Sequence, residues 1–111
     1  MKAYKNEWNA YEEAVILEII PEENTAVKKV GYVTPGALCP TKLPSITFKA
    51  ATLDNGRLFA CTQTEILVFR LPSFEIEHHV SIPSFNDVHH VLPAGNGSFL
   101  VANTGLDMVL E

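Results

Sequence analysis

Two stretches of the sequence resemble each other at a separation of about 41 residues, and this constrains the fold more than any other feature. They span residues 53–69 and 94–111, and Gly56 of the first aligns with Gly97 of the second, an offset of 41 (97 minus 56). Each contains an Asn-Gly pair, an apolar run, a short polar turn and a second apolar run. Because Asn and Gly adopt positive φ at little cost, the Asn-Gly pairs predict tight hairpins between antiparallel neighbours.

Further strand-like segments surround the first stretch. Residues 14–20 and 26–33 are apolar and flank a polar turn, which predicts a hairpin. Residues 75–82 alternate between apolar and polar side chains, as expected for a half-exposed strand. Pro and Gly in 34–45 break both helix and strand, so we expect an irregular connection there. Helical periodicity is confined to residues 4–15, where a short turn of helix is expected.

Composition bounds the class of protein. The chain has 111 residues, of which 47% are hydrophobic and 19% charged, as suits one soluble domain with a small core. Its net charge is −5, and its eight Lys and Arg are scattered, so we expect no nucleic-acid partner. The apolar runs are far shorter than the roughly 20 residues that cross a bilayer, and the first residues lack a hydrophobic signal core. The sequence therefore predicts a cytoplasmic protein without a membrane partner.

The two cysteines do not form a recognisable site. Cys39 stands beside Pro40 and Cys61 lies inside an apolar strand pattern, a spacing that suits neither a CxxC redox pair nor a zinc knuckle. We expect two separately buried thiols.

The repeat resembles a known architecture. A four-stranded antiparallel unit that recurs every 40 to 45 residues or so is typical of a β-propeller blade. The segment "NDVHHV…NGSFLVANTGLDMVLE" resembles one blade from its innermost strand outward. The chain is similar to a piece of the six- or seven-bladed propellers of the arylsulfotransferase-like and NHL-like kind. This resemblance implies an all-β fold of antiparallel four-stranded propeller blades, with about two and a quarter blades in this chain.

The resemblance also implies a division of the chain. Residues 1–13 form an N-terminal extension, 14–33 the outer hairpin of a first blade, 46–82 a complete second blade, and 85–111 the first three strands of a third blade.

Such blades bury their apolar faces only against neighbours, so partners are expected. The neighbours are either the remaining blades of a larger propeller or further copies in a homo-oligomer. Three copies would supply roughly six to seven blades, within the range in which propellers close. Against a closed trimer, residues 14–20 and 106–111 both offer a third-strand element, and these would overlap on closure.

A candidate site lies in the expected innermost strand of the last blade. Strand alternation places Asn86 and His90 on one face, and Asp87 and His89 on the other, so one histidine should face the central channel. Histidine titrates near neutrality, acts as a general base or nucleophile and binds metals, and a neighbouring Asp can fix its tautomer. The candidates are therefore His89, His90 and Asp87 for catalysis, His89 and His90 for a metal, and all four residues for ligand binding.

That segment also has a structural interpretation, in which the Asp-His pair ties the entry of the blade to its neighbour. The resemblance adds that arylsulfotransferase-like propellers use a channel histidine to carry a sulfuryl group. No cofactor is indicated by the sequence.

Other polar residues are expected to be surface features. His78 and His79 lie on the predicted outermost strand, where solvation is ordinary, and residues 103–107 resemble a hairpin turn. Arg57 and Lys49 are either solvated or available to an anionic ligand.

Three functional hypotheses remain open. The chain is a blade module that assembles and binds a ligand or partner at the channel mouth, and then His89→Ala and His90→Ala are tolerated. Alternatively it is part of a propeller enzyme, arylsulfotransferase-like or metal-assisted, that depends on those histidines. The third hypothesis is a truncated piece without activity of its own. The sequence favours the first and third, because it lacks a complete catalytic set.

Overall fold

The computed structural model describes residues 12–38, 46–103 and 108–110, and this part of the chain is all-β with antiparallel sheets, as expected from the sequence. No α-helix occurs in it; two short 3₁₀ turns, η2 (Pro21–Glu23) and η3 (Gly36–Leu38), follow β1 and β2. The short helical turn expected over residues 4–15 falls mainly outside the described residues, and Ala14 and Val15 belong to a strand. The strands are β1 (Ala14–Ile20), β2 (Thr25–Tyr32), β3 (Ala50–Asp54), β4 (Arg57–Cys61), β5 (Ile66–Arg70), β6 (Glu75–Val80), β7 (Val88–Pro93), β8 (Phe99–Asn103) and β9 (Met108–Leu110).

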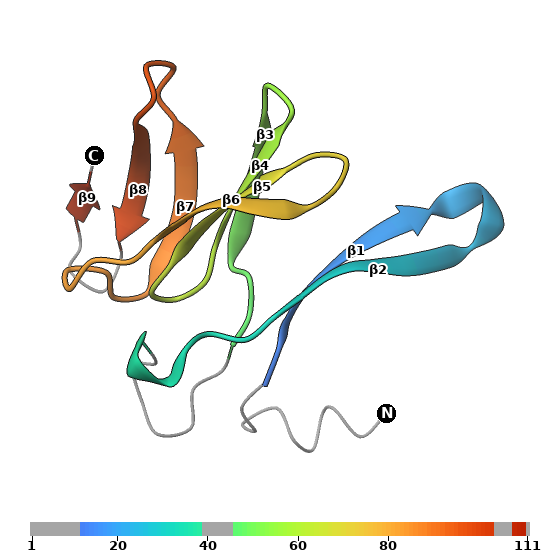
Figure 1. Cartoon of the computed structure of the whole chain (residues 1–111), viewed down its shortest axis with the longest axis horizontal. Helices are drawn as coiled ribbons and strands as arrows, with labels where there is room; N and C mark the ends of the chain where they lie inside the picture. Colours follow the sequence, from blue (N-terminus) through green and yellow to red (C-terminus); the bar gives the residue numbers. More distant parts are fainter. Residues whose placement is uncertain (1–11, 39–45, 104–107, 111) are drawn as a thin grey trace.

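The strands form three sheets, one of which is a hairpin and two of which are simple meanders. We call β1-β2 the hairpin sheet, β3-β4-β5-β6 the central sheet and β7-β8-β9 the C-terminal sheet. Every hydrogen-bonded pair joins strands that are consecutive in the chain. Figure 1 shows the central sheet between the hairpin sheet on one side and the C-terminal sheet on the other.

One face of the central sheet packs on the hairpin sheet. Ala60, Leu67 and Phe69 are buried on this face, and Ile16 and Tyr32 of the hairpin sheet pack against their cluster. We call this face of the central sheet its hairpin-side face. Burial of large aliphatic and aromatic side chains is the main favourable term that holds the two layers together.

The opposite face of the central sheet packs on the C-terminal sheet. Cys61 and Ile66 share a buried cluster with Val88, Val91 and Val101. We call this face the groove-side face, because a groove opens farther along it. Hydrogen bonds also join the layers across this contact: Thr52 Oγ1 donates to the Val91 carbonyl (2.7 Å), and the Val88 amide donates to the Gln63 carbonyl (2.9 Å).

Coverage on both faces explains the composition of β5. Its residues Ile66, Leu67, Val68 and Phe69 are all buried. A strand covered on both faces requires a continuous apolar run rather than an alternating one.

The two Asn-Gly turns differ. Asn55 and Gly56 both have positive φ (50° and 77°), which makes the two-residue hairpin turn between β3 and β4 that the sequence predicts. Between β7 and β8 the prediction of the same turn is wrong. There Gly95 and Gly97 have positive φ, and the Asn96 side chain instead accepts hydrogen bonds from the Ser98 amide (3.3 Å) and hydroxyl (2.6 Å). One additional residue in this loop changes the turn.

A bulge also corrects the expected alternation in β6. Val68 pairs with His78 while Phe69 pairs with Ile76, so Glu77 is the extra residue. Ile76 therefore lies on the hairpin-side face and His78 on the groove-side face, although simple alternation places them together.

Two further sequence expectations can be placed. Cys61 is a buried free thiol, and burial raises its pKa to about 11, while Cys39 lies outside the described residues. In the described part of the chain no helix is long and apolar enough to cross a membrane.

Candidate functional site

The histidines predicted for the site lie near the start of β7. Val88 pairs with Asn103 and His90 pairs with Ala102, so a bulge at His89 interrupts the ladder. Because of the bulge, Val88 and Val91 both pack in the core while His89 and His90 are both exposed. The expectation that strand alternation separates the two histidines onto opposite faces is therefore wrong.

Asp87 and His89 do lie together, as the sequence suggests. His89 Nε2 is 3.1 Å from Asp87 Oδ1, and the side chains are 48% and 39% exposed, respectively. Asp87 has a positive φ of 62°, a conformation that Asp tolerates better than most residues. The pair is therefore a solvated contact that leaves His89 accessible.

Asn86 is exposed, and its backbone amide helps to hold the loop before β7. Its amide donates to Oδ1 of the buried Asn103 (2.8 Å), and Nδ2 of Asn103 donates to the Ser84 carbonyl (2.6 Å). Asn103 thus fixes the loop before β7 by pairing both ends of its side-chain amide. The rest of the expected turn, residues 104–107, lies outside the described residues.

No group of three or more His, Cys, Asp or Glu side chains that could hold a metal ion occurs among residues 12–38, 46–103 and 108–110. Within these residues, neither His89 nor His90 therefore belongs to such a group.

A buried carboxylate forms the densest polar cluster in the described chain. Glu65, between β4 and β5, is fully buried. It accepts hydrogen bonds from Oγ1 of Thr34 (2.6 Å), from Oγ1 of Thr62 (2.9 Å) and from the Tyr32 hydroxyl. His79 Nε2 lies 2.7 Å from Oε2 of Glu65. We call these five residues the Glu65 cluster.

The electrostatics of the cluster keep Glu65 ionised. Burial raises the pKa of Glu65, but the hydrogen bonds from Thr34, Tyr32, His79 and Thr62 together lower it by more, so the net direction is downward. Burial, together with the bond to Glu65 and its charge, raises the pKa of Tyr32, which stays a hydroxyl donor. A buried carboxylate with this many donors is satisfied without a ligand.

The cluster joins the hairpin sheet to the central sheet. Tyr32 lies in β2 and Thr34 in the segment after it. Thr62 and Glu65 lie in the connection between β4 and β5, and His79 lies in β6. The expectations drawn from the sequence do not include Glu65, and they place His79 among solvated residues. The one local signal is an acidic residue between two apolar strands, three residues after a threonine.

A groove of about 360 Å³ opens between the groove-side face of the central sheet and the β7–β8 turn. Its apolar lining includes Phe59, Val68 and Phe99, and the rings of the two phenylalanines meet edge to face with centroids 6.2 Å apart. Arg57 and His78 add polar groups from β4 and β6. The groove therefore combines an aromatic lining with a cation, which is the usual composition of a small-molecule site.

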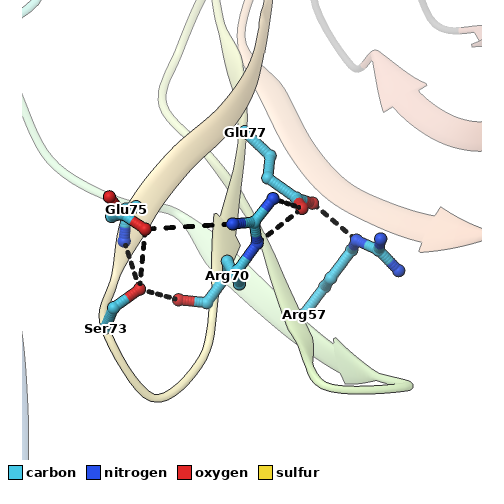
Figure 2. A network of polar contacts seen from close by, with 5 residues as sticks. All are labelled: Arg57, Arg70, Ser73, Glu75 and Glu77. Carbon is cyan, nitrogen blue, oxygen red and sulfur yellow. Dashed lines mark hydrogen bonds and ion pairs between the residues drawn. The ribbon is translucent and has the colours of Figure 1, made fainter.

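A shared carboxylate holds Arg57 in place. Arg57 and Arg70 are directly opposite in neighbouring strands, and Glu77 binds both, as Figure 2 shows. Glu77 Oε1 is 2.5 Å from Arg57 Nε, while Oε2 accepts from Arg70 Nε (2.8 Å) and pairs with its Nη2 (2.6 Å). These hydrogen bonds lower the pKa of Glu77. The bulge in β6 makes the arrangement by turning Glu77 toward both arginines.

No family model and no curated protein matches the sequence. The function of the chain therefore has to be inferred from its own geometry.

Proposed function

We propose that the chain is a β-propeller blade module that associates with further sheets of its own kind and binds a ligand or partner. The observation that carries this proposal is a pair of apolar sheet faces at the two ends of the three-layer stack. The outer face of the hairpin sheet exposes a row of large aliphatic side chains, and that of the C-terminal sheet exposes Leu92 beside the partly exposed Leu100. Exposed apolar surface of this kind is typical of interaction surfaces.

The first outer face belongs to the hairpin sheet. Val15, Leu17 and Ile19 are 40%, 52% and 59% exposed, and they alternate along β1 with Ile16, which packs on the central sheet. β1 is apolar at six of its seven positions, all but Glu18. This composition is that of a strand covered on both faces, so it supports a further layer over the hairpin sheet.

The second outer face belongs to the C-terminal sheet. Val91 and Val101 are paired and face the central sheet, so the neighbouring pair of Leu92 and Leu100 faces outward. Leu92 is 46% exposed. Together with Ala102, these side chains offer a second apolar surface.

The strand registers indicate what would cover the outer face of the C-terminal sheet. Leu58 pairs with Leu53 in the central sheet, and Phe99, its counterpart 41 residues later, pairs with Pro93 in the C-terminal sheet. In this alignment Leu100 corresponds to Phe59, which lies on the groove-side face of the central sheet. The C-terminal sheet covers the groove-side face of the central sheet. By analogy, this supports a similar sheet over Leu100 on the outer face of the C-terminal sheet.

The hairpin sheet resembles β5-β6 in the same way. Both hairpins have four-residue loops, and the last loop residue has positive φ in each, 55° at Asn24 and 63° at Phe74. In this alignment Leu17 corresponds to Leu67, which lies on the hairpin-side face of the central sheet. The two outer faces are thus counterparts of the two opposite faces of the central sheet, each of which is covered by another sheet inside the chain. This favours head-to-tail contact between copies.

In this proposal Asn86, the Asp87–His89 pair and His90 remain the candidates for contacting a ligand or partner at the entry of β7. Their accessibility supports such a role, and their replacement should leave the fold intact.

The test is the solution mass of the purified chain by light scattering at two concentrations. We expect a mass above the 12.2 kDa of one chain, and a loss of association in Leu17→Glu and in Leu92→Glu. Leu53→Glu is the matched control, because Leu53 is exposed but lies on the central sheet. A wild-type chain that is monomeric at both concentrations would contradict the proposal.

A further inference from the structure

We propose that the groove between the central and C-terminal sheets binds a small aromatic monocarboxylate, with its ring against Phe59 and Phe99 and its carboxylate on Arg57. The groove is made entirely from residues of one chain, so this inference does not depend on association between copies.

Arg57 is prepared for this role by its contact with Glu77. The 2.5 Å contact uses Nε, and Figure 2 shows the two terminal nitrogens of Arg57 on the side away from Glu77. Arg57 therefore offers the paired donors that bind a carboxylate through both of its oxygens. Because Glu77 already fixes the guanidinium, less side-chain freedom is lost when an anion binds.

Arg70 does not offer the same opportunity. Glu77 takes its Nε and Nη2 together, and Nη1 lies 3.9 Å from Glu75. Arg70 is also absent from the lining of the groove. The two arginines thus share a carboxylate, but Arg57 alone of the pair contributes to the groove.

The apolar lining suits a planar ring. Phe59 and Phe99 meet edge to face, and Val68 lies beside them in the lining. Edge-to-face aromatic contacts add to the free energy gained from burial. The volume of about 360 Å³ lies near the lower end of the range for small-molecule pockets, so the ligand is small.

The surrounding charges limit the ligand to a single negative charge. Glu77 lies behind Arg57 and neutralises part of the positive charge of both arginines, and Asp54 is itself in the lining. A dianion such as a phosphate monoester would be repelled by Asp54 more strongly than a carboxylate. His78, also in the lining, adds positive charge only when protonated.

The experiment is a titration with 2-naphthoate and with 2-naphthamide, its neutral counterpart, followed by calorimetry and by amide chemical shifts. We expect naphthoate to bind about tenfold more tightly than naphthamide, because the hydrogen bonds to Arg57 are charge-assisted. The largest shifts should fall on the β3–β4 and β7–β8 turns. Arg57→Gln should abolish the preference for naphthoate while naphthamide binds as before, and Arg57→Lys should keep part of it.

Arg70→Gln is the matched control and should keep the preference. The same titration with Leu17→Glu, which alters the outer face of the hairpin sheet, should give the wild-type result even if the chain does not associate. Absence of naphthoate binding, an equal preference in Arg57→Gln, or shifts centred on the two outer faces would overturn the proposal.

Discussion

The Glu65 cluster and the Asp87–His89 pair both place a carboxylate beside a histidine, at 2.7 Å and 3.1 Å, yet they differ in every other respect. Glu65 is fully buried and accepts three hydroxyl hydrogen bonds in addition, whereas Asp87 and His89 are both substantially exposed. The distance between histidine and carboxylate alone therefore does not reveal the role of such a pair. Burial and the number of donors make the first a structural contact, whereas the second is a solvated one.

The largest expected effect is that of Glu65→Ala. This change leaves Tyr32, Thr34 and Thr62 without their acceptor in a buried site, and we expect a loss of about 3–5 kcal/mol in the free energy of unfolding. Chemical denaturation measures it. A loss below about 1 kcal/mol would show that the cluster does not hold the two sheets together.

The pH dependence of stability should follow the same carboxylate. The pKa of Glu65 is lower in the folded chain than its ordinary unfolded value of about 4.3. Its contribution is therefore complete above about pH 4.3 and is lost as the pH falls through the folded pKa. The stability difference between wild type and Glu65→Gln should shrink from pH 7 to pH 3 in denaturation at matched salt. A difference that grows on acidification would contradict this assignment.

Tyr32→Phe should have a smaller effect, because it removes one of the donors and keeps the ring. We expect a loss of about 1.5–3 kcal/mol, as for a hydrogen bond to a charged group. Hydrogen exchange should show faster opening of the hairpin sheet in this variant than of β4 and β5. Uniform acceleration across the sheets would mean that Tyr32 does not serve specifically to attach the hairpin.

The exposed pair should show the smallest effect. His89→Ala and Asp87→Asn each remove a solvated contact, so thermal denaturation should detect changes of about 0.5 kcal/mol or less. A loss above about 2 kcal/mol would place this pair with the Glu65 cluster.

The sequence predicted the strands better than the faces on which some side chains lie. Turn residues such as Asn55 and Gly56 and the apolar runs of β1, β4 and β5 act locally, so the all-β class and the hairpins follow from short windows of sequence. The bulges at Glu77 and His89 depend on how one strand meets its neighbours, and they moved side chains away from the expected faces.

The Glu65 cluster and the groove were missed for a related reason. Thr34 and Glu65 are 31 residues apart, and His79 is 14 residues beyond Glu65, so no local pattern brings them together. The groove likewise needs Arg57 of β4 to lie opposite the β7–β8 turn. Only the packing of the three sheets creates these neighbours.

Mixing two variants tests most directly the proposal that the outer faces join head to tail. Leu17→Glu blocks the outer face of the hairpin sheet, and Leu92→Glu blocks that of the C-terminal sheet, so each variant keeps one intact face of a complementary pair. We expect each variant to be monomeric alone and the equimolar mixture to contain a one-to-one dimer by light scattering. Monomers in the mixture, or a dimer formed by either variant alone, would contradict head-to-tail association.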